Sequence, residues 1–125
     1  MKSLRRMFIL ALSVPLIAGL AVPQTPEQYV YVVTHVDISG TPAVFAAGTR
    51  LLKEFSAESR KDPGVVRFEL LIQTGRLNHF TILEVWRTRE AFEAHTAAEH
   101  TKRFRLDIQP MLGSPFDERL HSLLQ

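Results

Sequence analysis

The chain has 125 residues, of which 46% are hydrophobic, and it contains no cysteine. The absence of cysteine excludes disulfides, a thiol nucleophile and thiolate metal sites. The chain has 15 basic and 13 acidic residues, but three of the basic ones lie within residues 1–21. Without that segment, 12 basic and 13 acidic residues remain, scattered among one another, so the charge gives no support to nucleic-acid binding.

Residues 1–21 have the plan of a secretory signal peptide. Basic residues precede an apolar run from Met7 to Leu20, and small residues occupy positions 19 and 21, as they do before a cleavage site. The run is short and contains Pro15, so we expect no stable membrane anchor after cleavage. The adjacent Arg5 and Arg6 also resemble a twin-arginine signal, which leaves the general and twin-arginine export routes both open.

Removal of the signal would leave 104 residues of an exported, periplasmic or secreted protein. We expect residues 22–28 to form a lead-in segment and residues 29–125 to form a single domain. A domain of this size without disulfides has little room for both a core and a deep cavity. Pairing with a second copy would relieve that shortage, so we expect a homodimer.

The first half of the domain predicts a strand, a helix and a second strand. Residues 29–37 are rich in β-branched and aromatic side chains, which is typical of a strand. Thr41 and Pro42 then begin a helix that is expected to end near Arg60. Asp62-Pro63-Gly64 forms a turn, because proline fixes φ and glycine permits the positive φ that follows. The second strand covers residues 65–72.

The second half predicts a strand at 79–86, helices at 89–99 and about 102–112, and a final strand at 116–124. Thr88 is the expected N-cap of the first of these helices, and Gly113-Ser114-Pro115 ends the second. The order β-α-β-β-α-(α)-β is that of the ferredoxin-like split βαβ unit. The predicted fold class is therefore α+β, with an antiparallel sheet and helices on one face.

Alternation along the strands sorts their side chains into two sets. The aliphatic set, expected beneath the helices, is Val30, Val32, Val36, Val66, Phe68, Leu70, Leu83 and Val85. The other set is aromatic and polar, and suits the lining of a cavity or an intersubunit face: Tyr29, Tyr31, Val33, His35, Arg67, Glu69, Phe80, Ile82, Glu84 and Trp86.

The order and spacing of several motifs resemble the antibiotic biosynthesis monooxygenase domain family. They are Asp62-Pro63-Gly64, RFEL at 67–70, FTILEVW at 80–86, EAFEAH at 90–95 and the later His100. The resemblance spans about residues 29–123. It implies a dimeric α+β barrel and oxygenation of phenolic or quinol-type aromatic substrates with no cofactor. The same fold also includes haem-degrading enzymes and an isomerase.

Two departures from that family's patterns concern asparagine. The haem-degrading branch is similar in fold but uses an asparagine in the first strand and a tryptophan in the second helix. Here the single asparagine is Asn78, and His95 stands where that tryptophan would be, which disfavours haem degradation. Oxygenase members also place an asparagine just before the tryptophan that Trp86 matches, and none precedes it here.

The candidate catalytic residues are His95, Glu84 and Trp86. His95 is either a core histidine or a general base that takes a phenolic proton. Glu84 either pairs with Arg67 on the neighbouring strand or orients and polarises His95. Trp86 either fills an interface or is a flat wall on which an aromatic substrate stacks. The candidate substrate-binding residues are Tyr31, His35, Arg67, Phe80 and Trp86.

No metal site is expected. His100 follows His95 by five residues, which is about 140° around an α-helix and unsuitable for two ligands on one helical face. No third ligand is evident in the sequence, and we expect His100 near the surface.

The sequence therefore predicts a cofactor-independent monooxygenase of a small aromatic, phenolic or quinol-type substrate, with O₂ as co-substrate in a cavity of a homodimer. Two alternatives stay open. The first is an exported dimer that binds a small hydrophobic ligand without turnover. The second is an isomerase of the same fold that uses His95 and Glu84 as an acid–base pair.

Overall fold

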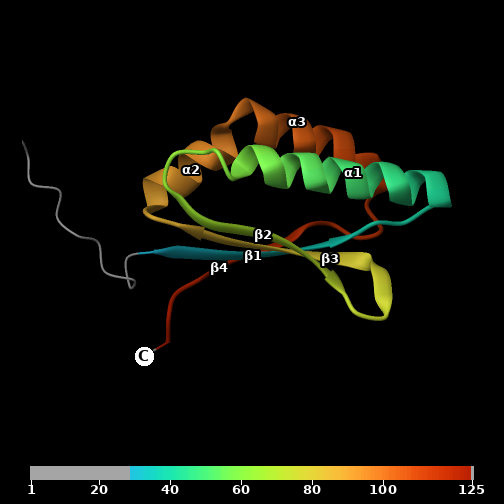
Figure 1. The fold of residues 1–125 in the computed structure, drawn as a ribbon, viewed down its shortest axis with the longest axis horizontal. Coiled ribbons are helices and arrows are strands. Elements are labelled where there is room, and N and C mark those ends of the chain that lie inside the picture. Colours follow the sequence, from blue (N-terminus) through green and yellow to red (C-terminus); the bar gives the residue numbers. More distant parts are fainter. Residues whose placement is uncertain (1–28, 125) are drawn as a thin grey trace, which may run out of the picture.

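The computed structural model describes residues 29–124, which form one sheet with helices on one of its faces (Figure 1). The expected signal peptide 1–21 and lead-in segment 22–28 lie outside the described residues. The elements, in chain order, are β1 (Val30–Asp37), α1 (Pro42–Ser59), β2 (Val65–Gln73), β3 (Arg76–Trp86), α2 (Arg89–Ala97), α3 (Glu99–Ile108), the short 3-10 helix η2 (Gln109–Met111) and β4 (Asp117–His121). Within the described part of the chain, no helix is long and apolar enough to cross a membrane.

The sheet is antiparallel, and its strands lie in the order β2-β3-β1-β4. The two central strands, β3 and β1, are therefore distant in sequence, as the split βαβ arrangement requires. The helices α1, α2 and α3 cover one face, and no described helix covers the other (Figure 1). The ferredoxin-like α+β fold that the order of elements predicted is confirmed.

Side-chain caps fix the starts of two helices. Thr41 Oγ1 accepts a hydrogen bond from the Val44 backbone N–H at 3.4 Å, at the start of α1. Thr88 Oγ1 accepts one from the Ala91 backbone N–H at 3.1 Å, at the start of α2. Such caps satisfy backbone donors that have no partner within the helix. Both helices begin where the sequence predicts.

Several predicted boundaries differ from the structure: α2 ends at Ala97 rather than 99, α3 ends at Ile108 rather than about 112, and β4 covers only Asp117–His121. Two further differences have clear causes. The third strand begins at Arg76 rather than at residue 79, because Gly75 adopts a φ of +81° and allows a tight hairpin turn. The helix predicted from about residue 102 begins at Glu99, directly after Ala98, whose backbone is extended (φ −64°, ψ 148°). The chain thus breaks sharply between α2 and α3, and this break matters for the site.

The face assignment from strand alternation is wrong for β3. Glu84 lies opposite Val32 of β1 and opposite Phe68 of β2. Residues that face each other across paired strands project to the same side of a sheet. Glu84, Trp86, Phe80 and Ile82 therefore lie under the helices. Tyr31 lies opposite Val85, on the uncovered face.

The reason for the error is that β3 carries apolar side chains on both of its faces. Leu83 and Val85 alternate with Phe80 and Ile82, so hydrophobicity alone does not fix which set faces the helices. The core beneath the helices is made by buried side chains from both layers: Val32, Val36, Ile38, Leu52, Phe55, Phe68, Phe80, Ile82, Trp86, Phe92, Phe104 and Ile108.

The turn before β2 depends on Gly64, which has a φ of +83°. A Cβ added there would lie 2.6 Å from the Cβ of Ala91 in α2, whereas a Cβ at Gly75, with φ +81°, would meet nothing within 4 Å. Both Gly→Ala changes strain the backbone by about 1–2 kcal/mol. We expect Gly64→Ala to lower the free energy of unfolding by a further 1–3 kcal/mol or so, because it also overpacks α2.

Urea denaturation of the two variants measures this difference, with Gly75→Ala as the matched control. Equal losses of unfolding free energy in the two variants would mean that the Cβ added at position 64 does not overpack α2.

Candidate active site

His95 lies in the last turn of α2, and its side chain is only 3% exposed. Its ring stacks on Trp86 of β3, with 4.5 Å between ring centroids and 29° between planes. Phe55 and Phe68 also pack against it, at centroid distances of 5.7 and 5.9 Å. The imidazole is thus held between the sheet and α1 by aromatic rings, which fix its orientation.

Asp62, in the turn that follows α1, contacts the Nδ1 side of the His95 ring. Its Oδ2 lies 2.7 Å from Nδ1 of His95. A carboxylate accepts hydrogen bonds, so this contact assigns the proton of the neutral ring to Nδ1 and leaves the lone pair on Nε2. Burial lowers the pKa of His95 below 6.5, and the hydrogen bond to Asp62 opposes that shift without cancelling it. His95 is therefore a neutral base near pH 7.

Glu84 faces Nε2 of His95 from β3. Its Oε2 accepts a hydrogen bond from Trp86 Nε1 at 2.7 Å and lies 3.9 Å from His95 Nε2. Burial raises the pKa of Glu84 to about 7, although the Trp86 hydrogen bond acts in the other direction. Near neutral pH the Glu84 carboxyl is thus close to its titration range, and it faces a neutral imidazole that can accept its proton.

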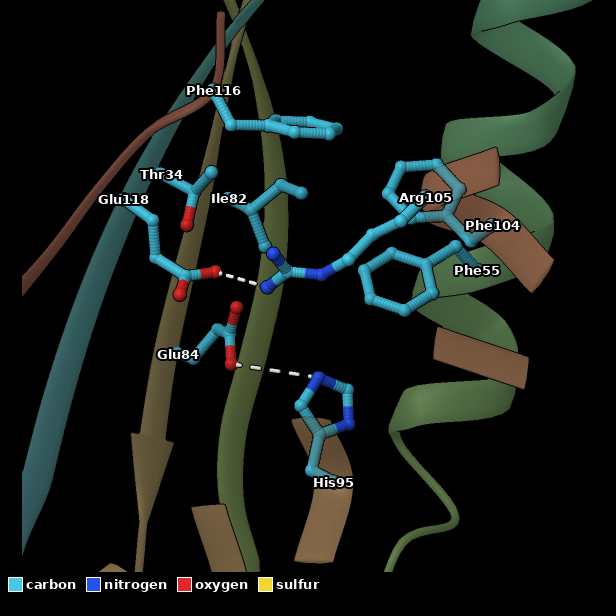
Figure 2. A pocket seen from close by; sticks show the side chains of 9 residues that line it. All are labelled: Thr34, Phe55, Ile82, Glu84, His95, Phe104, Arg105, Phe116 and Glu118. Carbon is cyan, nitrogen blue, oxygen red and sulfur yellow. Dashed lines mark hydrogen bonds and ion pairs between the residues drawn. The ribbon is translucent and has the colours of Figure 1, made fainter. Parts of the chain in front are cut away.

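A small cavity adjoins these two groups (Figure 2). Its volume is about 20 Å³, enough for one water-sized molecule. Glu84 and His95 point toward one another at one end of the cavity, while Arg105 of α3 reaches Glu118 of β4, with 2.6 Å between Nη2 and Oε2. The buried hydroxyl of Thr34 has no hydrogen-bond partner among residues 29–124 and also lines the cavity. The remaining lining residues are Phe55, Ile82, Phe104 and Phe116.

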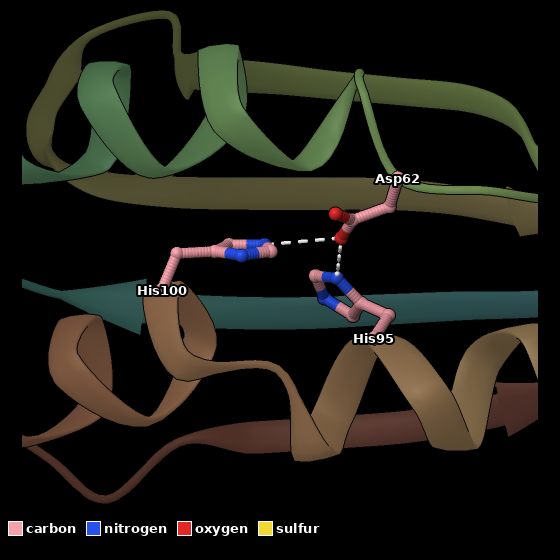
Figure 3. A group of neighbouring side chains, drawn as sticks. All are labelled: Asp62, His95 and His100. Atoms are coloured by element: carbon pink, nitrogen blue, oxygen red, sulfur yellow. Dashed lines mark hydrogen bonds and ion pairs between the residues drawn. The ribbon is translucent and has the colours of Figure 1, made fainter.

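His100 joins the cluster from the first turn of α3 (Figure 3). Its Nε2 lies 3.0 Å from Asp62 Oδ2, and its side chain is 17% exposed. The separation of about 140° that holds on one continuous helix does not apply, because the extended backbone at Ala98 separates α2 from α3 and places His100 in a new helix. Both imidazoles therefore approach the same carboxylate.

The structure brings together three of the predicted site residues and separates the others from them. His95, Glu84 and Trp86 are in contact. Phe80 is 2% exposed in the core, where it packs against Phe45 with 6.1 Å between centroids. Phe80 is not among the side chains that line the cavity.

The predicted substrate-binding residues of the other strand face lie away from this cavity. Tyr31, His35 and Arg67 are on the sheet face without helices. His35 Nδ1 lies 3.1 Å from Thr81 Oγ1, and Arg67 Nη2 lies 2.8 Å from Glu69 Oε2. The predicted pairing of Glu84 with Arg67 is therefore wrong, because the two side chains point to opposite faces.

Asp62 was missed as a site residue by the sequence reasoning, which assigned it only to a turn. The tight Pro63-Gly64 turn directs its carboxylate back toward α2, and the register of that turn is not visible in the sequence. The one available signal was an ionisable residue between a helix and two turn-forming residues, which is also common in loops with no function.

Comparisons with known proteins agree on the fold. The model of the antibiotic biosynthesis monooxygenase family matches residues 31–106, more than half of the chain. No curated protein matches the sequence significantly. A candidate antibiotic biosynthesis monooxygenase from Nitrosomonas europaea is 17% identical, with a TM-score of 0.71 over 78% of this chain and 92% of that one. Another, from Bacteroides thetaiotaomicron, is 24% identical, with a TM-score of 0.67 over 81% of this chain and 92% of that one.

A further crystal structure, of an antibiotic biosynthesis monooxygenase, is 22% identical to this chain. Its TM-score is 0.71, and the match covers 77% of this chain and 99% of that one. At these identities the solved structures establish the fold alone. The match of the family model covers most of the sheet and helices that hold Asp62, Glu84, His95 and His100, and this chain belongs to the antibiotic biosynthesis monooxygenase family.

Proposed function

We propose that this protein is a cofactor-independent monooxygenase that acts on a small phenolic or quinol-type aromatic molecule. The observation that carries the proposal is the hydrogen bond from the buried His95 to the partly buried Asp62, which leaves Nε2 of His95 free to face the cavity beside Glu84. A phenol of pKa near 10 reacts poorly with O₂, whereas its anion is a good electron donor. A buried neutral imidazole is a suitable acceptor for that phenolic proton.

In the proposed reaction, Nε2 of His95 takes the phenolic proton, and the anion transfers one electron to O₂. The resulting radical pair combines to form a peroxide at the substrate carbon. With an anthrone-type substrate, a CH₂ group becomes a carbonyl group as the O–O bond breaks. One oxygen atom stays in the product and the other leaves as water, so the four electrons lost by the carbon reduce O₂ completely and no further reductant is needed.

Each neighbour of His95 has a role in this proposal. Asp62 keeps the proton on Nδ1 and so keeps Nε2 basic. Glu84, with its pKa raised to about 7, receives or returns a proton as His95 changes charge. Trp86 holds the imidazole plane and orients the Glu84 carboxyl. Asn78 is not part of the site, since its amide donates to the Ile38 carbonyl at 3.3 Å.

Substrate entry requires a local opening, because the cavity of about 20 Å³ admits only a water-sized molecule. The Arg105–Glu118 ion pair is the element proposed to open. Its side chains are 43% and 27% exposed, and an ion pair in contact with solvent costs about 1 kcal/mol or less to separate.

The proposal includes export and a homodimer. The uncovered sheet face carries Tyr31, Val33 and Leu83, all only partly buried in the single chain. A second copy packed on this face would bury them, so Tyr31, His35 and Arg67 are proposed to belong to the subunit contact. Sedimentation equilibrium tests the dimer, and a species of single-chain mass at micromolar concentration would contradict it.

The first test is oxygen uptake by the purified protein, free of metal and flavin, with a panel of anthrones, hydroquinones and catechols. We expect uptake with at least one anthrone-type phenol, and mass spectrometry with ¹⁸O₂ to find one labelled oxygen atom in its product. Unlabelled product, or no uptake across the panel, would contradict the monooxygenase.

An acid–base isomerase is the second candidate. It is favoured by one observation, that the Glu84 carboxyl, whose pKa burial raises to about 7, lies 3.9 Å from Nε2 of His95. An isomerase would convert its substrate equally fast with and without oxygen, and would incorporate deuterium from D₂O at the isomerised carbon. Ligand binding without any chemical change would instead support the exported binding dimer.

A further inference from the structure

We infer that Asp62, His95 and His100 form a binding site for one divalent transition-metal ion of the class that imidazole and carboxylate ligands prefer, such as Zn²⁺ or Co²⁺. The three candidate ligand atoms all lie within 4.8 Å of one another. They come from the turn after α1, the last turn of α2 and the first turn of α3 (Figure 3). Two nitrogen donors and one oxygen donor are a common ligand set for such ions.

The separations between the candidate ligand atoms are close to those found around a bound metal ion. Asp62 Oδ2 lies 2.7 Å from His95 Nδ1 and 3.0 Å from His100 Nε2. Ligand atoms about 2.1 Å from a metal ion are about 3.0 Å apart at a right angle and about 3.4 Å apart at a tetrahedral angle. Small side-chain rotations, of a few tenths of an ångström for the carboxylate contacts, would therefore open the cluster around an ion.

His100 supplies an independent observation. Its Nε2 is fully buried and has no hydrogen-bond partner within the described part of the chain, although the Asp62 carboxylate oxygen is only 3.0 Å away. Whether Nε2 carries a proton or a lone pair, it is not directed at that oxygen well enough to form a hydrogen bond. A cation bound between the two atoms satisfies both, and buried polar atoms are seldom left without a partner.

Glu84 is placed to support such a site. When Nδ1 of His95 binds a metal ion, the ring proton must lie on Nε2, which faces the Glu84 carboxylate at 3.9 Å. A carboxylate that accepts the second ring N–H of a metal-binding histidine is the usual partner of such ligands. Trp86 in turn holds Glu84 through a hydrogen bond of 2.7 Å. The cluster therefore has the ligands and, 3.9 Å from one of them, a carboxylate that a shift of about 1 Å would bring into hydrogen-bond range.

The ion also has a route and room for additional ligands. A surface groove of about 410 Å³ runs past Asp62, His95 and Ala98, along α2 and the turn before β2. The side chains of Asp62 and His100 are 16% and 17% exposed, whereas that of His95 is 3% exposed. Solvent therefore reaches the site from the side of Asp62 and His100. Water molecules could complete the coordination from the groove side.

Metal binding has a consequence that rests on the proposed function. A metal ion on Nδ1 forces the His95 proton onto Nε2, and the imidazole then has no lone pair with which to accept a substrate proton. The metal-bound form is therefore the inactive form of the proposed oxygenase. An ion that ties α1, α2 and α3 together should also raise the melting temperature.

The test is calorimetric titration of Co²⁺ and Zn²⁺ into untagged protein dialysed against EDTA. We expect one ion per chain, visible d–d absorption bands with Co²⁺, and a higher melting temperature. Asp62→Asn and His100→Gln should each weaken binding by more than the roughly 10–100-fold that follows loss of a residue that only orients a ligand.

The matched control is His79→Gln. His79 Nδ1 lies 2.8 Å from Asp37 Oδ1, a pair with nearly the same spacing as Asp62 and His95. Among the described residues only the Asp62 cluster gathers three candidate ligands, so this control should bind metal as the wild type does. Far-ultraviolet circular dichroism confirms that each variant is folded.

No saturable binding to the wild type would overturn the site, and so would unchanged binding in both Asp62→Asn and His100→Gln. A failure of oxygen uptake leaves the titration unaffected, and a failure of the titration leaves oxygen uptake in EDTA unaffected. The two proposals are therefore tested separately.

Discussion

Replacing His95 with glutamine is expected to slow oxygen uptake by about 10²–10⁴-fold, the usual contribution of a general base. Glutamine has nearly the length of histidine, and its amide can still donate to Asp62, so the packing against Trp86 is largely kept. It has no basic nitrogen to direct toward the cavity. Initial rates at saturating substrate in EDTA measure the effect, and thermal unfolding confirms that the variant is folded.

The pH profile separates a base from a residue that only supports the fold. Burial lowers the pKa of His95 below 6.5, and only the neutral ring accepts a proton. The wild-type rate should therefore fall as the pH drops through that lowered pKa. The residual rate of His95→Gln should lose this inflection.

His79→Gln is the control for this prediction, because that histidine is also held by an aspartate, at 2.8 Å, but lies on the uncovered face of the sheet. It should retain the wild-type rate and pH profile. Full activity in His95→Gln would contradict the assignment of His95 as the base. Loss of activity in His79→Gln alone would mean that the reaction takes place on the uncovered face of the sheet.

Replacing Glu84 with glutamine should remove a pH-dependent destabilisation of about 2–3 kcal/mol between pH 5 and pH 8. Burial raises the pKa of Glu84 from 4.5 to about 7, so the folded protein binds more protons than the unfolded chain in that interval. Its contribution to the free energy of unfolding therefore falls as the pH rises from about 4.5 to 7 and is constant above that range. Glutamine cannot ionise but still accepts the Trp86 hydrogen bond.

Urea denaturation in EDTA at pH 5 and pH 8 measures this effect. The change in the free energy of unfolding between the two pH values is determined for wild type and for Glu84→Gln, and the two changes are compared. His95 acts in the opposite direction, because its lowered pKa removes stability as the pH falls through 6.5, but it is present in both proteins. The charges of Glu118 and Arg105 near Glu84 are common to both as well.

Glu93→Gln, at an exposed site on α2, is the control and should change the free energy of unfolding by less than about 0.5 kcal/mol. A pH-independent gap between wild type and Glu84→Gln would mean that Glu84 ionises normally.

The fold was predictable because its signals are local and agree with one another. Thr41 and Thr88 start helices that the apolar spacing also predicts, and Gly64 marks a turn that proline precedes. The order of elements then leaves few arrangements other than the split βαβ sheet. These inferences need only neighbours within a few residues along the chain.

The site was predictable only in part, because its geometry depends on register and on one backbone angle. The contact among Glu84, Trp86 and His95 follows from a strand that leads directly into a helix. The place of Asp62 depends on how its turn packs on α2, and that of His100 depends on the extended ψ of 148° at Ala98. Neither is encoded by residue type alone, since alanine strongly favours a continuous helix.

Trp86 gives the site its own optical reporter. It is the single tryptophan of the chain, so the indole emission of the protein arises entirely from a ring that stacks on His95 and donates a hydrogen bond to Glu84. Because the ring is completely buried, bulk solvent changes its emission little while the fold is intact. A change in the charge of the imidazole or the carboxyl alters the field on the indole directly. Fluorescence can therefore follow proton uptake, metal binding and ligand entry at this one place without any label.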